Sequence, residues 1–187
     1  MFLVVGGLVG LLAGLVAGGS LSNLHYIRFR WPLAVVVTLV ARDLVAFPAF
    51  AHLAIEPAIY SLALFGLIVW TLWHHDQIPG IWIVSVGMAL NLVVILANAG
   101  HMPVPVELSG SGPPELARTG VLGHYVLSGP QTRLPWLGDW IALPGPIGHI
   151  FPQAYSPGDL VAFVGIGVVL FLGVLGGSYY SAVRARS

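Results

Sequence analysis

Five long apolar stretches constrain the fold of this chain more than any other feature of its sequence. A helix needs about 20 residues to cross the hydrocarbon core of a bilayer, with a range of roughly 17–25. Lipid offers no hydrogen bonds to a backbone, and the stretches lack barrel-like alternation, so each should be an α-helix. The five predicted spans are Phe2–Gly18, Pro32–Leu53, Pro57–Trp73, Gly80–Ala99 and Asp159–Tyr179.

The composition agrees with a membrane environment and excludes several other classes. The 187 residues are 57% apolar and 7% charged, whereas soluble domains carry about 25% charged residues. We therefore expect one all-α membrane domain over residues 1–187, with an ordered outer cap (101–157) between the fourth and fifth helices. A net charge of zero without a basic stripe excludes a nucleic-acid partner. The absence of cysteine excludes disulfides, thiolate zinc sites and iron–sulfur clusters.

The arginines predict the orientation of the spans. Loops on the cytoplasmic side carry an excess of basic residues. Arg28 and Arg30 separate the first two spans, and Arg184 and Arg186 follow the fifth. An odd number of spans puts both pairs on one side, so the C-terminus should be cytoplasmic, and the N-terminus and cap outside. The first span has no basic residues before it, so we expect a retained helix and not a cleaved signal peptide. Four tryptophans fall at the predicted inner interface: Trp31, Trp70, Trp73 and Trp82.

Glycines recur at every fourth position of the first span, which places them on one helix face. Such a face lets a neighbouring helix approach closely. It could contact a protein partner or a second copy of the chain, or it could pack inside the monomer. The predicted packing glycines are Gly6, Gly10, Gly14 and Gly18 in the first span, with Gly173 and Gly177 in the fifth.

Polar residues inside the spans form a candidate polar site. Asn91 and Asn98 lie two turns apart on one face of the fourth span. They could hydrogen-bond to a neighbouring helix or line a polar cavity. Arg42 and Asp43 fall near the middle of the second span, where a charge costs about 2.5–3.5 kcal/mol on insertion scales. The two are either a structural pair with partners elsewhere or functional groups.

The outer segment should be ordered, because its aromatic content is too high for a disordered linker. Within it, Trp136–Ile141 could form a short turn in the membrane interface. The cap should end where the last span begins. Ser156 is the predicted N-cap of that helix, and Asp159, at the third helical position, should complement the helix dipole.

The histidines suggest only weak candidate sites, and no cofactor or metal is predicted. His52 and His101 lie near the outer rim, where a haem or pigment ligand pair is conceivable. A metal site built from His101, His124, His149 and Asp139 lacks any supporting spacing. The His74–Asp76 segment should mark a hydrated helix end. Motifs of metalloproteases, serine hydrolases and nucleotide-binding enzymes are absent, so no catalytic residue is predicted.

The segment Asn98-Ala99-Gly100-His101-Met102-Pro103-Val104 resembles an Asn-Gly-Gly-x-Met-Pro-Val motif. That motif belongs to a family of small bacterial multi-span membrane proteins of unknown function. Leu137-Gly138-Asp139 and Ser156-Pro157-Gly158-Asp159 resemble its later landmarks. The chain departs from the motif at Ala99, where glycine is usual. The resemblance implies a location in the bacterial cytoplasmic membrane and no known activity. It also implies one outer constellation of Asn98, Gly100, Met102, Pro103, Asp139 and Asp159.

Two functions follow as expectations. The first is a non-catalytic multi-pass protein, an accessory or assembly subunit of a larger bacterial membrane complex, which contacts a partner or a second copy through its glycine-faced helices. The second is a membrane-embedded protein or enzyme that binds a small molecule or lipid. Its candidate polar site comprises Arg42, Asp43, Asn91, Asn98, His101 and Asp139.

Overall fold

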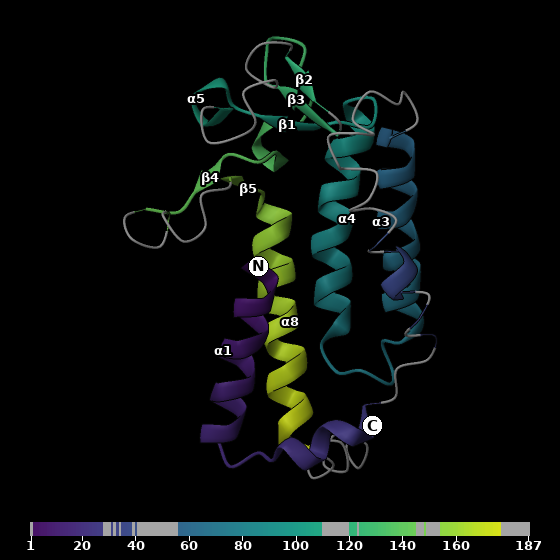
Figure 1. The fold of residues 1–187 in the computed structure, drawn as a ribbon, viewed down its shortest axis with the longest axis vertical. Coiled ribbons are helices and arrows are strands. Elements are labelled where there is room, and N and C mark those ends of the chain that lie inside the picture. Colours follow the sequence, from purple (N-terminus) through teal and green to yellow (C-terminus); the bar gives the residue numbers. More distant parts are fainter. Residues whose placement is uncertain are drawn as a thin grey trace.

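The computed structural model is mostly helical. It describes residues 2–27, 31, 33, 35–38, 40, 56–109, 120–122, 124–144, 148 and 154–176. Four longer helices dominate (Figure 1). They are α1 (Phe2–Val16), α3 (Glu56–Trp73), α4 (Ile81–Ala97) and α8 (Pro157–Leu175).

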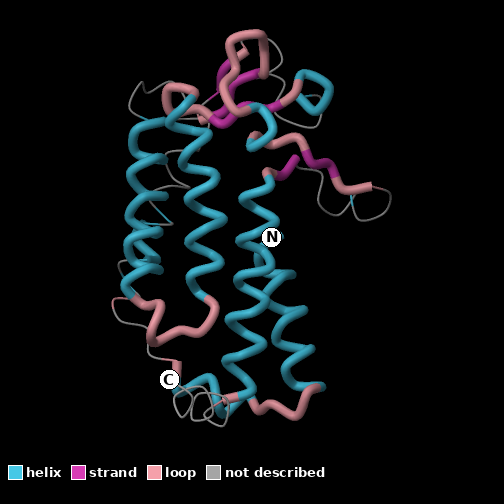
Figure 2. The backbone as a smooth tube through the Cα atoms, turned by 180° about the vertical axis from the view of Figure 1, so that it is seen from behind, coloured by secondary structure: helices cyan, strands magenta, loops and turns pink. Residues whose placement is uncertain are grey.

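Helix α8 lies between α1 and α4, and α3 packs against the other side of α4. The ring of Phe2 stacks on Phe163 near the start of α8, and Gly14 lies beside Val174 near its end. Helices α1 and α8 therefore run parallel. Helix α4 runs antiparallel to both. Figure 2 shows the same arrangement from behind, with the cap at one end and the 3-10 helix η1 (Leu21–Tyr26) at the other.

The helices coincide with four of the five predicted spans. The second predicted span, Pro32–Leu53, lies largely outside the described residues. Among the described residues, only α8 is long and apolar enough to cross a membrane by length and composition. The segments Phe2–Val16, Pro57–Trp73 and Ile81–Ala97 are shorter apolar helices. The fold is thus helical as predicted, with one helix of spanning length in the described part of the chain.

The cap is built from short strands as well as turns. Strand β1 (Met102–Val104) pairs in parallel with β3 (Tyr125–Leu127), which pairs antiparallel with β2 (Val121–Leu122). Strands β4 (Ile141–Ala142) and β5 (Ala154–Tyr155) form a second, antiparallel pair. The short helix α5 (Val106–Ser109) follows β1, and the 3-10 helix η2 (Pro135–Leu137) precedes β4. The sequence predicted order here but no strands, because two or three residues carry no readable alternation.

Two apolar clusters hold this arrangement together. One lies beneath the cap, where Met102 and Leu137 pack on Ile68, Val94 and Ile95 of α3 and α4. The other lies at the opposite end, where the residues around the start of α4 meet Val169 of α8. Cap and helices therefore form one packed unit at the cap end.

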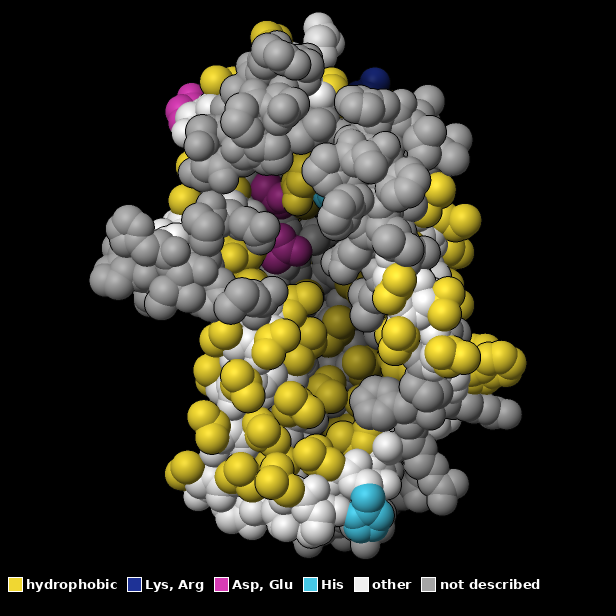
Figure 3. All heavy atoms as spheres, viewed as in Figure 1, with side chains coloured by type: hydrophobic (Ala, Val, Ile, Leu, Met, Phe, Trp, Pro, Cys, Tyr) yellow, Lys and Arg dark blue, Asp and Glu magenta, His cyan; other side chains and the backbone are white. Residues whose placement is uncertain are grey.

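The side chains of α1 are distributed in the reverse of the usual pattern. All the buried residues of α1 are glycines. Its large apolar residues face outward: Leu3, Val4, Leu8, Val9, Leu12 and Val16 are all exposed. Figure 3 shows apolar side chains covering the face over α1 and α8.

Candidate functional site

The start of α8 is the most highly organised polar region of the described chain. Ser156 is the N-cap, and its hydroxyl oxygen accepts a hydrogen bond from the Asp159 amide at 2.9 Å. The Asp159 carboxylate accepts one in return from the Ser156 amide at 3.0 Å. This reciprocal capping box satisfies two free amides and places a negative charge at the positive end of the helix dipole. The sequence predicted Ser156 as the N-cap and Asp159 beside the helix dipole, and the structure adds the reciprocal bond from the Ser156 amide to Asp159.

Asn91 joins this capping box to α4. Its amide nitrogen donates to Asp159 Oδ1 at 2.8 Å, and its Oδ1 accepts from the Ser156 hydroxyl at 2.8 Å. The helices come this close because Gly158 faces Gly87, with no side chain on either. Of the two alternatives for Asn91, the structure therefore shows hydrogen bonding between helices.

Asn98 instead holds the cap. Its amide nitrogen donates to the Arg133 carbonyl and to the Val94 carbonyl, both at 2.8 Å. Its Oδ1 accepts from the Arg133 amide at 2.9 Å. The Asn98 side chain thus hydrogen-bonds to both the backbone amide and the backbone carbonyl of one cap residue, Arg133. Asn98 also lines an open groove of about 610 Å³ between the end of α4 and the loop after β3.

The residues after Asn98 make a sharp corner between α4 and the cap. Ala99 and Gly100 both adopt positive φ, 56° and 91°. A Cβ at Gly100 would lie 2.8 Å from the Cβ of Pro57, so the corner also packs tightly on α3. Glycine tolerates this left-handed backbone, whereas alanine pays a steric cost. The structure thus explains why glycine suits position 99.

The corner places β1 next to the segment that carries Asp139. The Asp139 amide donates to the Pro103 carbonyl at 2.9 Å. A Cβ at Gly138 would lie 2.5 Å from the same oxygen, so only glycine fits there without a shift. The three segments that carried the family resemblance therefore meet at the cap end of the helices.

Asp139 is buried there without a hydrogen bond to one of its oxygens. The side chain is 7% exposed, and Oδ1 has no partner. Burial, followed by the negative charge of Asp159, raises the pKa of Asp139 well above its ordinary value of 3.8. Figure 3 shows acidic side chains in a hollow between the cap and the helices.

Tyr155 is the residue of this region that the sequence analysis missed. It is buried, and its ring lies 4.2 Å from that of Phe2. Burial and then the Asp159 charge raise its pKa above 10.0. Tyr155 directly precedes the N-cap, a position that often carries a packed apolar side chain, and this signal could have identified it.

The described histidines do not assemble a metal site. His124 is buried, and its ring stacks on that of Tyr60 with the centroids 4.0 Å apart and lies tilted against that of Tyr125 at 4.1 Å. His101 is half-buried after the corner. Within the described residues, no group of three or more His, Asp or Glu side chains is placed to hold a metal. His52 and His149 lie outside those residues, as do Arg42 and Asp43.

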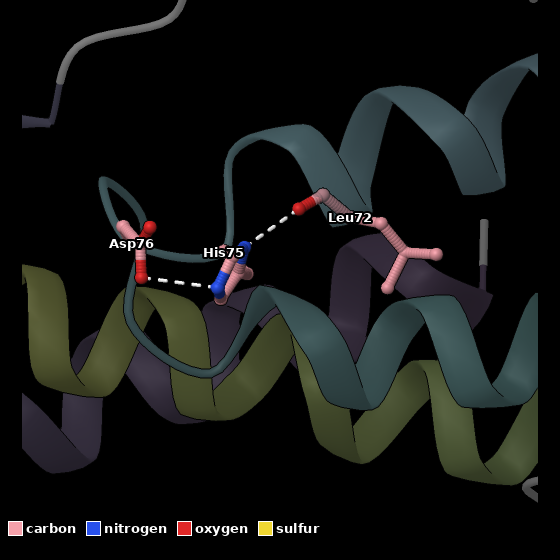
Figure 4. Close-up of polar contacts among 3 residues, drawn as sticks. All are labelled: Leu72, His75 and Asp76. Carbon is pink, nitrogen blue, oxygen red and sulfur yellow. Dashed lines mark hydrogen bonds and ion pairs between the residues drawn. The ribbon is translucent and has the colours of Figure 1, made fainter.

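The prediction of a hydrated end at His74–Asp76 was wrong for its first residue. His75 and Asp76 are exposed, and they interact at 3.0 Å while the His75 ring also contacts the Leu72 carbonyl (Figure 4). His74, however, is 2% exposed. Its ring stacks on Trp70, and its Nδ1 bonds to the Trp70 carbonyl at 2.8 Å.

The glycine faces are used inside the chain. A Cβ at Gly6 would lie 2.6 Å from the Phe163 carbonyl oxygen of α8, and Gly10 and Gly14 approach α8 equally closely. Gly173 faces Ile27 and Leu24 around η1, whereas nothing lies within 4 Å of a Cβ at Gly18. Gly177 is outside the described residues.

Comparisons with known proteins place the chain in a family without giving it an activity. Residues 26–172 match the model of a family of unknown function, DUF5317. The match covers all three segments that meet at the cap. No curated protein and no solved structure matches the chain. By this match over most of its length, the chain belongs to the DUF5317 family of unknown function.

Proposed function

We propose that the chain is a five-span protein of the bacterial cytoplasmic membrane, with its cap outside and its C-terminus in the cytoplasm. In this proposal it is a non-catalytic accessory or assembly subunit of a larger membrane complex. The carrying observation is the reversed side-chain distribution of α1, whose buried residues are glycines and whose exposed residues are valines and leucines. Water disfavours such a surface, whereas lipid accepts it and leaves small residues to pack the helices.

The course of the chain supports the orientation. Ile27 lies beside Gly173, and Asn23 beside Gly176, at the end of α8 far from the cap. Arg28 directly follows Ile27 in sequence, and Arg184 follows α8. Both arginine pairs therefore follow segments that end away from the cap, as a cytoplasmic side opposite the cap requires.

The lengths of the shorter helices are compatible with the proposal. The 15 residues of α1 rise about 22 Å, and the 19 residues of α8 rise about 28 Å. A helix shorter than the hydrocarbon core is accommodated by local thinning of the bilayer at modest cost. Exposed tryptophans at the end away from the cap, Trp73 and Trp82, suit the interfacial region there.

The accessory role draws support from the bonding of the polar side chains. Asn91, Ser156 and Asp159 bond to one another, and Asn98 bonds to backbone, as residues of a structural joint do. A second candidate, a membrane protein that binds a small ligand, is favoured by one observation: the free oxygen of buried Asp139.

The absence of cysteine from the chain allows a clean test of orientation. Glu107 is exposed on the cap, and the Asp76 side chain is 84% exposed in the turn at the other end. Single variants Glu107→Cys and Asp76→Cys are treated in intact cells with a membrane-impermeant maleimide. We expect labelling of Glu107→Cys at once, and of Asp76→Cys only after permeabilisation. Labelling of both in intact cells, or the reverse pattern, would contradict the proposal.

The assembly role needs a separate test. The chain is extracted from its native membrane in mild detergent and examined by native mass spectrometry. We expect it to be detected in a complex of fixed stoichiometry. A monodisperse monomer under the same conditions would contradict the accessory role and leave the orientation intact.

A further inference from the structure

The carboxylate oxygen of Asp139 that lacks a hydrogen bond costs folding free energy unless a ligand binds to it. A buried polar group without a hydrogen bond costs roughly 1–3 kcal/mol, and more when it is charged. Asp139 is held in place by its own backbone, through the bond to Pro103, and by the tight contact of Gly138 with the same carbonyl. These contacts fix the backbone at the position where the Asp139 side chain is buried.

A second carboxylate with spare acceptor capacity, that of Asp159, lies at the same end of the helices. The pairing of β4 with β5, in which Ile141 faces Tyr155, brings the segment of Asp139 against the start of α8, where Asp159 stands in the first turn. Figure 3 shows acidic side chains together in the hollow between the cap and the helices. Asp159 Oδ1 accepts from Asn91 and Asp159 Oδ2 from the Ser156 amide, one bond each. A carboxylate offers about four acceptor positions, so about two remain.

Among the described residues, no positively charged side chain pairs with Asp139 or Asp159. Arg133 is the sole arginine in the described residues, and its side chain is exposed on the cap loop. Neither Asp139 nor Asp159 forms an ion pair within that part of the chain. Among the described residues, the hollow thus combines two carboxylates with free acceptor positions and no paired arginine.

We propose that Asp139 and Asp159 bind a hard divalent cation, Mg²⁺ or Ca²⁺, which ties the cap to the start of α8. Both ions prefer oxygen ligands, and two carboxylates match the charge of one such ion. Two carboxylates are too few to enclose a metal, so the ion keeps several waters and exchanges readily, as Mg²⁺ commonly does. This site is distinct from the histidine set considered from the sequence, and it does not depend on the proposed number of spans.

Direct binding is tested on the purified full-length chain in detergent with Tb³⁺, an oxygen-seeking luminescent stand-in for Ca²⁺. Trp140 is adjacent to Asp139 in sequence, and Trp136 lies three residues before it. Excitation of tryptophan should give sensitised Tb³⁺ emission that Ca²⁺ or Mg²⁺ displaces at millimolar concentration. Absence of displaceable emission from the folded protein would overturn the proposal.

Variants separate this site from general screening by salt. The thermal midpoint is measured at pH 8 against MgCl₂ or CaCl₂, with ionic strength held constant by choline chloride. The wild type and the control Glu107→Gln, an exposed acid of the same cap, should show a saturable rise. Asp139→Asn should bind no Tb³⁺ and show no rise. An equal rise of the thermal midpoint in Asp139→Asn would overturn the proposal. Absence of a rise in the wild type would overturn it too, and would leave the proton as the only ligand of Asp139. If Asp139→Asn does not fold, Asp159→Asn is examined by Tb³⁺ emission in its place, with the same criteria.

Discussion

Gly10 of α1 lies directly against Gly167 of α8, and a Cβ built on Gly10 would be 2.6 Å from the Gly167 Cα. The neighbouring atoms are backbone, so they cannot turn aside as a flexible side chain would. Gly6 and Gly14 make comparable approaches one turn away on either side. Contact between α1 and α8 therefore depends on the absence of side chains along this line, a recurring device of helix packing in lipid.

Gly10→Ala should separate α1 from α8. Overpacking of this kind costs about 1–3 kcal/mol, and the cost here should fall at the upper end because backbone must move. Gly66→Ala in α3 is the matched control, since nothing lies within 4 Å of a Cβ at that position. The thermal midpoint of the purified protein should fall for Gly10→Ala and not for Gly66→Ala. Equal midpoints for the two variants would show that the α1–α8 contact does not matter for stability.

Asp139→Asn should raise stability at alkaline pH when divalent cations are removed by chelator. The raised pKa of Asp139, caused by burial and by the Asp159 charge, means that the fold favours its protonated form. The stability that this group contributes is full below its ordinary pKa and is lost as pH rises through the raised one. Asparagine does not titrate, so the variant should lose less stability than the wild type between pH 4 and pH 9. Parallel profiles of unfolding free energy against pH would refute the assignment.

Asn98→Ala should loosen the cap without disturbing the α1–α8 pair. The change removes three hydrogen bonds and leaves the Arg133 amide and carbonyl without their side-chain partner. The local cost should be about 1–3 kcal/mol. Hydrogen exchange of the backbone around Arg133 should quicken, while that of α8 stays unchanged. Gln131→Ala, in the same loop at an exposed position, is the control and should exchange as the wild type does.

The sequence predicted the features that depend on neighbouring residues. The starts of the four described long helices lie within two residues of the predicted ones, because apolar runs and capping residues act locally. The capping role of Ser156 follows from the same local rules. The glycine spacing predicted close helix packing, yet spacing is the same for a partner and for a helix of the same chain. Only the fold shows that α8 occupies the face of Gly10.

The candidate site could be predicted only in part. The parallel pairing of Met102 with Tyr125 joins segments too short to show a strand pattern, so it leaves no trace in the sequence. Asp139 lies in an apolar run beside Trp140, which indicated a turn but not a buried carboxylate without a partner. Its neighbour Gly138 packs against Pro103, 35 residues earlier in the chain, and no local pattern encodes such a contact.

Ala99→Gly should stabilise the protein, because the wild-type alanine has a φ of 56°. A left-handed backbone costs a non-glycine residue about 1–2 kcal/mol, and glycine removes this cost. The greater conformational entropy of glycine in the unfolded chain offsets about 0.5–1 kcal/mol of the resulting stabilisation. The expected net gain is about 0.5–1 kcal/mol. Gly100→Ala is the opposite case, since its φ of 91° is strained for alanine and its Cβ would press on Pro57. Denaturant unfolding in detergent should show a higher midpoint for Ala99→Gly and a lower one for Gly100→Ala. A loss of stability in Ala99→Gly would mean that the corner between α4 and β1 is held by something other than its backbone conformation.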